Sequence, residues 1–231
     1  IWIASSGVVI YIDYVDMGGK TVNTGIISSA AENTLGIYTR LTASVNPLLT
    51  PAAEVKNTGS IVLSNGSIGI FSENTKIENS GNIKVGGAIS NTGSVGIYGS
   101  KNSEIKNTGG NIEVGDDGVA FYGNNSSIDI SGGSFDVSKG TMIYGANGTN
   151  INYGVNGVTL GDKTGIYLDS SSINLNGNNL TLSDNGVGIY VSNNSNITGL
   201  GTLRVKNNAQ GIYLNGSNIS SIGGTIEIDG T

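Results

Sequence analysis

The chain lacks cysteine and histidine, and its 231 residues include only two prolines and two arginines. Without these side chains, thiolate and imidazole metal ligation is excluded, as are most general-base and nucleophilic schemes. Charged residues make up only 12% of the chain, and Asn, Ser, Thr and Gly fill most of the polar positions. We expect no cofactor and no metal ion.

The charge balance and the absence of long apolar runs restrict the partners. The net charge is −6 with no basic cluster, which argues against nucleic acid because its phosphates are neutralised by Lys and Arg. No apolar run approaches the roughly 18 residues that indicate a membrane-spanning helix. We therefore expect no nucleic-acid partner and no transmembrane segment in this chain. The absence of cysteine also fits a protein that is exported unfolded, since a cross-linked loop would obstruct passage.

What the sequence does contain is a repeat, most visible in Gly188–Ile197 (GIYVSNNSNI) and Gly211–Ser220 (GIYLNGSNIS). One aromatic residue recurs at intervals of 22 to 33 residues, a spacing typical of a solenoid. These aromatics are Tyr11, Tyr38, Phe71, Tyr98, Tyr122, Tyr144, Tyr167, Tyr190 and Tyr213.

Each repeat holds three short apolar segments bounded by Gly, Asn and Ser, which predicts three strands and three turns. Helical repeats are disfavoured because Gly and Asn interrupt every window of ten residues. The leucine frame of a leucine-rich repeat is missing. We predict an all-β fold, a parallel β-helix of about nine coils, with the right-handed connections that parallel crossovers nearly always have.

Period-two alternation assigns the side chains of the first strand to two faces. The Ile of each Gly-Ile-Tyr segment is expected to point inward and the Tyr outward, in an exposed aromatic column. That column comprises Tyr98, Tyr122, Tyr144, Tyr167, Tyr190 and Tyr213. Its rings either stack on sugar rings or another rod, or form a ladder that stabilises the sheet.

In the second strand, Asn57, Asn79 and Asn107 lie two residues after an inward aliphatic residue. We therefore expect a structural stack of inward amides, each bonding the next along the axis. Later coils place Ile130, Tyr153 and Leu175 at this position. Each Asn of the stack is followed by Thr-Gly or Ser-Gly, and glycine is expected there for the positive φ of a tight corner.

The repeat is interrupted at three places, and insertions in a solenoid are expected to emerge as loops. We predict one continuous β-helix over residues 1–231, with loop insertions at 12–21, 39–54 and 86–93 and with both ends cut from a longer rod. Leu41, Leu48 and Leu49 in the second insertion form a candidate binding loop, because loops on rigid scaffolds often carry specificity. The alternative is that these leucines only cover the neighbouring surface.

Some β-helices degrade polysaccharides, so an enzyme is the main alternative function. Hydrolases of that kind need two carboxylates facing each other across the sugar bond. The adjacent pair Asp116 and Asp117, with Asp162 and Asp184 in later coils, is the nearest approach to such a site, and a turn explains it equally well. Asn-x-Ser/Thr triplets such as Asn124–Ser126 are expected by chance in so Asn-rich a chain. We predict no catalytic residues and no enzyme.

The corner sequences NTGSI, NSGNI and NTGGNI, joined to GIY strands, resemble the passenger domains of type V autotransporters, which are large adhesins of Gram-negative bacteria. The resemblance covers the whole chain, most clearly residues 53–231. It implies an exported rod on the bacterial cell surface that attaches to host cells or other bacteria through protein or glycan receptors. It transfers no individual functional residue.

On this basis the expected function is non-enzymatic adhesion, coaggregation or biofilm formation through side faces or loops. The alternatives are a polysaccharide lyase or hydrolase and a purely mechanical spacer. The open sheet ends of such a rod also predict end-to-end self-association.

Overall fold

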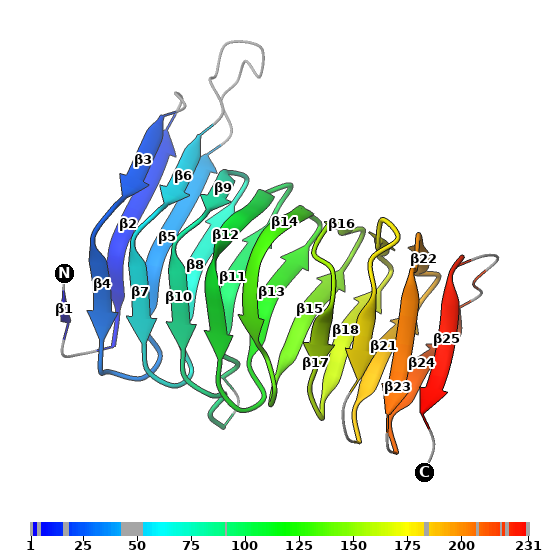
Figure 1. Cartoon of the computed structure of the whole chain (residues 1–231). Helices are drawn as coiled ribbons and strands as arrows, with labels where there is room; N and C mark the ends of the chain where they lie inside the picture. The colour runs from blue at the N-terminus through cyan, green and yellow to red at the C-terminus, as the bar shows by residue number, and fades with distance from the viewer. Residues whose placement is uncertain are drawn as a thin grey trace.

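The computed structural model describes residues 2–3, 6–15, 19–42, 53–90, 92–182, 185–206, 208–217, 219 and 222–229. This part of the chain is all-β and contains no helix. Figure 1 shows the chain advancing coil by coil from one end of the stack to the other, with the two termini at opposite ends. The predicted parallel β-helix is confirmed.

The first face of the stack is a nine-stranded parallel sheet with one strand from each coil, so the described chain makes about nine coils. Its strands are β2 (Val8–Val15), β5 (Leu35–Thr42), β8 (Ile68–Glu73), β11 (Val95–Ser100), β13 (Val119–Asn124), β15 (Thr141–Ala146), β18 (Thr164–Asp169), β21 (Val187–Ser192) and β24 (Gln210–Asn215).

The second face holds the middle strand of each coil. Its strands are β3 (Lys20–Asn23), β6 (Glu54–Asn57), β9 (Lys76–Asn79), the starts of β12 (Glu104–Val114) and β14 (Ser127–Asp136), β16 (Asn150–Tyr153), β19 (Ser172–Asn174) and β22 (Asn196–Thr198).

The third face holds the last strand of each coil. Its strands are β1 (Trp2–Ile3), β4 (Ile26–Ser29), β7 (Ser60–Leu63), β10 (Asn82–Val85), the ends of β12 and β14, and then β17 (Val158–Leu160), β20 (Leu180–Leu182), β23 (Thr202–Lys206) and β25 (Thr225–Asp229).

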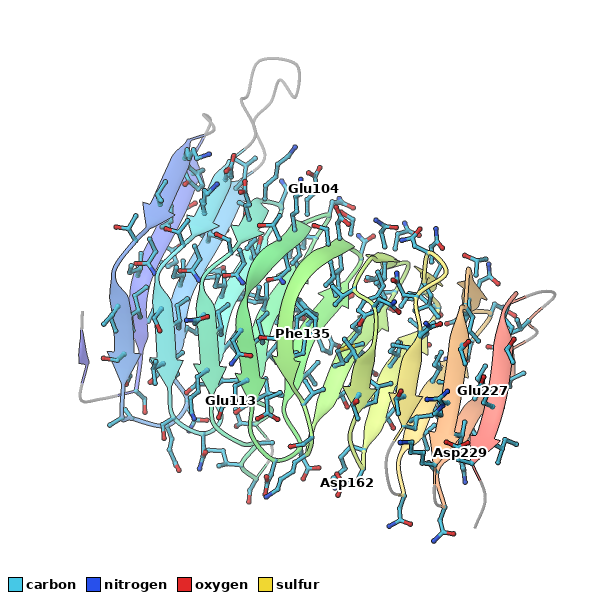
Figure 2. The ribbon with its side chains drawn as sticks, viewed as in Figure 1. Glu104, Glu113, Phe135, Asp162, Glu227 and Asp229 are labelled. Atoms are coloured by element: carbon cyan, nitrogen blue, oxygen red, sulfur yellow. The ribbon has the colours of Figure 1, made fainter. Side chains whose placement is uncertain are left out.

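The pairing departs from three separate sheets at one place. Strands β12 and β14 continue around a corner, so the second face and the first part of the third face form a single twelve-stranded sheet. Strands β17, β20, β23 and β25 form a separate four-stranded sheet. Phe135, near the end of β14, packs edge-on against Phe121 with 5.6 Å between the ring centroids and lies where the two sheets separate (Figure 2).

The core is a set of columns in which equivalent residues of neighbouring coils lie on one another. On the first face, the Ile of the repeat pairs with the Ile or Phe of the next coil. These residues are at most 1% exposed from the second coil to the eighth, as predicted: Ile37, Ile70, Ile97, Phe121, Ile143, Ile166 and Ile189. Burial of such side chains contributes about 1.5–3 kcal/mol each, and stacking is what completes that burial.

The strict alternation expected along the first strand fails at its end. Ser100, Ala146 and Ser192 follow the aromatic position by two residues, yet they are buried rather than outward. The chain bends there into the next corner, so the last strand residue turns beneath the neighbouring coil. Period two therefore holds only within the straight part of each strand.

Candidate functional site

The aromatic column on the first face is continuous from Tyr11 to Tyr213, with neighbouring ring centroids 4.5–5.1 Å apart. From Tyr122 onward each ring is nearly parallel to the next, with interplanar angles of 8–19°. Each inner ring therefore covers the face of its neighbour, and the side chains between the two ends are half-buried.

This packing decides what the column presents to a ligand. Sugar rings stack on the face of an aromatic ring, and between Tyr122 and Tyr190 those faces already lie against other tyrosines. Ring edges and hydroxyl groups remain accessible. Burial raises the pKa of Tyr122, and it raises the pKa of Tyr144 to about 12. The geometry favours the sheet-stabilising ladder over a row of sugar-stacking platforms.

The buried asparagines of the second face form a hydrogen-bonded ladder. The amide of Asn57 donates to Asn79 at 2.7 Å, and that of Asn79 donates to Asn107 at 2.7 Å. All three side chains are 0% exposed. Asn23 donates to Asn57 at 2.7 Å, and the series ends where the amide of Asn107 donates to the carbonyl of Gly132. The sequence interpretation omitted Asn23, although the segment Asn23-Thr24-Gly25 repeats the same motif.

The glycine that follows each ladder residue is needed for a different reason from the expected one. Gly59 and Gly81 do not have a positive φ. A Cβ at Gly59 would lie 2.1 Å from the carbonyl oxygen of Gly25, and one at Gly81 equally close to that of Gly59. Close approach of neighbouring coils, not left-handed backbone, therefore selects glycine at these two positions.

Left-handed backbone recurs along the stack at the corner between the first and second faces. Asn residues tolerate this conformation because their short polar side chains bond locally. The residues at this corner with φ between 51° and 66° are Asn74, Lys101, Asn102, Asn125, Asn147, Ser170, Asn193 and Asn194.

A buried Ser or Thr completes each of these corners. The hydroxyl of Ser195 donates to the carbonyl of Ser192 at 2.6 Å and accepts the N–H of Ser171 from the preceding coil at 3.0 Å. Ser171 in turn accepts the N–H of Thr149. The triplets Asn124–Ser126, Asn147–Thr149 and Asn193–Ser195 thus lie at these corners, whereas Asn196–Thr198 forms strand β22.

The candidate carboxylates are paired with lysines of other coils. Asp116 lies 3.5 Å from Lys139 and Asp117 lies 3.1 Å from Lys163, while Asp184 falls outside the described residues. Figure 2 shows Glu104, Glu113, Asp162, Glu227 and Asp229 spread along the stack. Within the described ranges, no group of three or more His, Cys, Asp or Glu is arranged to hold a metal ion.

The expected loop insertions are partly regular structure. Residues 12–15 and 39–42 extend β2 and β5 and pair with one another. In the third insertion, Ile89 and Thr92 form a small antiparallel bridge. Leu41, at the end of β5, lines a hollow of about 400 Å³ together with Arg40, Glu73 and Lys101. Leu48 and Leu49 of the candidate binding loop lie outside the described residues.

The second face carries two outward columns of side chains, which the sequence interpretation did not consider. In the first four coils they alternate in charge along the axis, except that the second column begins with Val22. Ion pairs join Lys20 to Glu54, Lys56 to Glu78 and Lys76 to Glu104 at 2.6–3.0 Å. Hydrogen bonding from Lys56 lowers the pKa of Glu78. The signal was the alternation of Lys and Glu at the period of the repeat.

In the next four coils the same two columns become almost uncharged. A groove of about 360 Å³ lies along them. The first column consists of Ser127, Asn150, Ser172 and Asn196, and the second of Asp129, Asn152, Asn174 and Thr198.

These features define the class of the protein as a parallel β-solenoid with polar side faces. No protein family, curated protein or solved structure shows a significant match to the chain. Within the described residues, no helix has the length and apolar character needed to cross a lipid bilayer.

Proposed function

We propose that this chain is a non-enzymatic segment of an adhesive rod displayed on the surface of a Gram-negative bacterium, as part of an autotransporter passenger. Its partners in this proposal are protein or glycan receptors on host cells or other bacteria, and further copies of the chain. The observation that carries the proposal is the repetition of outward side-chain columns along the stack, which presents one chemistry many times on one rigid face. Repeated weak contacts on a common scaffold give an avidity that no single contact has.

The rival hydrolase requires a pair of carboxylates positioned across a glycosidic bond. Asp116 and Asp117 are instead each within ion-pair distance of a lysine, which supports the non-enzymatic proposal.

The test is attachment of beads that carry the chain to bacterial and epithelial cells, alongside an assay for new reducing ends and unsaturated sugars from cell-surface polysaccharides. The proposal expects retention of cells without polysaccharide cleavage. Cleavage that depends on the chain would establish the enzyme instead.

The mechanical-spacer alternative is tested by deleting residues 144–212, which joins Ile143 to Tyr213 in register. A purely mechanical spacer only holds a binding tip that lies elsewhere on the rod. Attachment by that tip would then be unchanged apart from its shorter reach. Loss of attachment by a shortened rod with unchanged β-sheet circular dichroism would place binding in the deleted coils. Failure of both the full and the shortened chain to retain any cell would reject adhesion.

A further inference from the structure

The neutral groove of the second face crosses four coils at right angles to their strands. Adjacent coils are spaced about 4.8 Å apart, so equivalent polar groups recur at that interval along the groove. A ligand that used the whole groove would therefore be a chain running along the axis of the stack, with polar groups repeated along its length.

The groove has hydrogen-bonding capacity that the protein does not consume. Asn150 accepts a hydrogen bond from Ser172 at 2.7 Å, and Asn174 accepts one from the N–H of Asn176 at 3.0 Å. Among the described residues, the amide nitrogens of Asn150 and Asn174 and the side chain of Asn196 have no hydrogen-bond partner. Amides donate and accept at once, as hydroxyl groups do.

The charge of the groove selects against ionic ligands. Asp129, whose carboxylate accepts a hydrogen bond from Asn152 at 2.9 Å, is the single charged residue among those lining this groove, and it would repel sulfated or phosphorylated chains. The corresponding surface of the first four coils is filled by long Lys and Glu side chains that pair with one another, and the groove there measures about 200 Å³.

The backbone selects against peptides. Strands β14, β16, β19 and β22 are joined by continuous parallel pairing, so their backbone groups are used within the sheet and offer no edge for strand addition along the axis. The groove also lacks the charged or aromatic pockets that anchor most peptide side chains.

We propose that this groove, from Ser127 to Thr198 on the second face, binds a linear uncharged polysaccharide along the axis of the rod. The inference rests on the proposed adhesive function and names the receptor class and the coils that engage it. Because each coil adds similar hydrogen bonds, affinity rises with the length of the sugar chain until the groove is filled.

The experiment is calorimetric titration of the chain with linear neutral oligosaccharides of β-1,4-, β-1,3- and α-1,4-linked glucose and of mannose. Each is supplied as the monosaccharide and as oligomers of increasing length, with heparin as the anionic comparator. The expected result is binding of at least one neutral series, affinity that increases with length, and weaker binding of heparin.

Removal of two amides from the groove tests whether the polysaccharide binds there. Asn150→Ala combined with Asn196→Ala is expected to weaken binding by at least about tenfold, since each lost hydrogen bond to ligand is worth roughly 1 kcal/mol. The matched control is Thr159→Ala combined with Thr181→Ala on the third face, which should leave binding unchanged. Circular dichroism checks that both double variants retain the fold.

Three results would overturn the inference: no neutral series binds, heparin binds more tightly than every neutral series, or the groove and control variants behave alike. If the beads still retain cells, adhesion stands: in the first two cases the receptor is of another class, and in the third it binds another part of the rod. If cell retention is also lost, the proposed function fails with it.

Discussion

The second face of the stack contains two regions that share a backbone and one inward column of aliphatic residues, but differ in their other columns. From Lys20 to Asn107 its interior includes a ladder of amides, and its exterior alternates between Lys and Glu. From Ser127 to Thr198 its interior is apolar and its exterior carries Asn, Ser and Thr.

The junction between the two regions shows what each coil requires of its inward side chains. Asn107 pairs in register with Ile130, which pairs with Tyr153, so an amide and an apolar side chain occupy the same inward position in successive coils. Parallel pairing fixes the backbone, and each buried amide then needs a hydrogen-bond partner along the axis, which for Asn107 is the carbonyl of Gly132. A ladder of amides satisfies itself as completely as a column of aliphatic residues does.

The aromatic column follows the same division. In the first region three of the four neighbouring ring pairs are inclined by 51–75°, whereas after Tyr122 all are nearly parallel. The second region also has the uniform coil length, with the aromatic recurring every 22 or 23 residues after Tyr122. Equal coils place successive rings in equivalent surroundings, so they adopt the same orientation.

The largest loss of stability is expected when an amide, as found in the interior of the first region, is introduced into the apolar interior of the second. Leu175→Asn removes a fully buried aliphatic side chain and introduces an amide without a neighbouring amide. We expect the free energy of unfolding to fall by about 3–5 kcal/mol, measured by guanidinium denaturation followed by circular dichroism. A fall below about 1 kcal/mol would show that this interior accepts an unpaired amide and that the two regions are not distinct.

The reverse exchange places an aliphatic side chain in the amide ladder of the first region. We expect it to lower the free energy of unfolding by less, and by an amount that depends on whether one or all of the ladder residues are replaced. Asn79→Leu leaves Asn57 without its acceptor and Asn107 without its donor, which we expect to cost about 2–3 kcal/mol in the same denaturation experiment.

The triple replacement of Asn57, Asn79 and Asn107 by Leu removes both partners of each internal bond. It should cost less than the single change, because an apolar column replaces the whole ladder. If the triple variant lost as much unfolding free energy as the three single variants added together, the ladder would not act as a unit.

Alkaline pH is expected to lower the stability of the fold through the aromatic column of the second region. The pKa of Tyr144 is raised by burial from 10.0 to about 12 in the folded chain, so the unfolded chain loses its proton first. Stability is therefore full below pH 10 and declines as the pH rises toward 12. Denaturation midpoints across this window, combined with tyrosinate absorbance, measure the effect. Tyr144→Phe should flatten the decline, and an unchanged slope would assign the loss to other groups.

The smallest effect is expected from the charged exterior of the first region. Hydrogen bonding from Lys56 lowers the pKa of Glu78, so this pair stabilises the fold above the unfolded value of 4.5 and loses its effect as the pH falls through the lower folded value.

Glu78→Gln should reduce the unfolding free energy by about 0.5 kcal/mol at neutral pH and low salt, and by nothing measurable in molar salt. Asn150→Ala in the second region provides the uncharged comparison, because among the described residues its amide accepts only from the Ser172 hydroxyl, and its denaturation midpoint should respond to salt as the parent's does. A salt-independent loss for Glu78→Gln would mean that its role is packing.

Several elements of this structure were predictable from local sequence. Ile37 and its equivalents were placed inward by alternation, and Asn57, Asn79 and Asn107 by their distance from an aliphatic residue. Asn23 and the alternation of Lys and Glu were equally accessible, because both recur at the period of the repeat.

Other elements depend on contacts between coils. The need for glycine at Gly59 arises from the carbonyl of Gly25 in the coil before it. The inward turn of Ser100 and Ser192 depends on the corner that follows each strand. The separation of β17 from β14 has no sequence signal that we can identify.

The sequence alone determined the unit, its period and the composition of its columns, because a residue copied at a fixed interval must meet its own copies when parallel strands stack. Only the tertiary structure decided which ring faces are covered, which amides remain free and where a groove opens. Those properties depend on distances between side chains of different coils, which a repeat length does not specify.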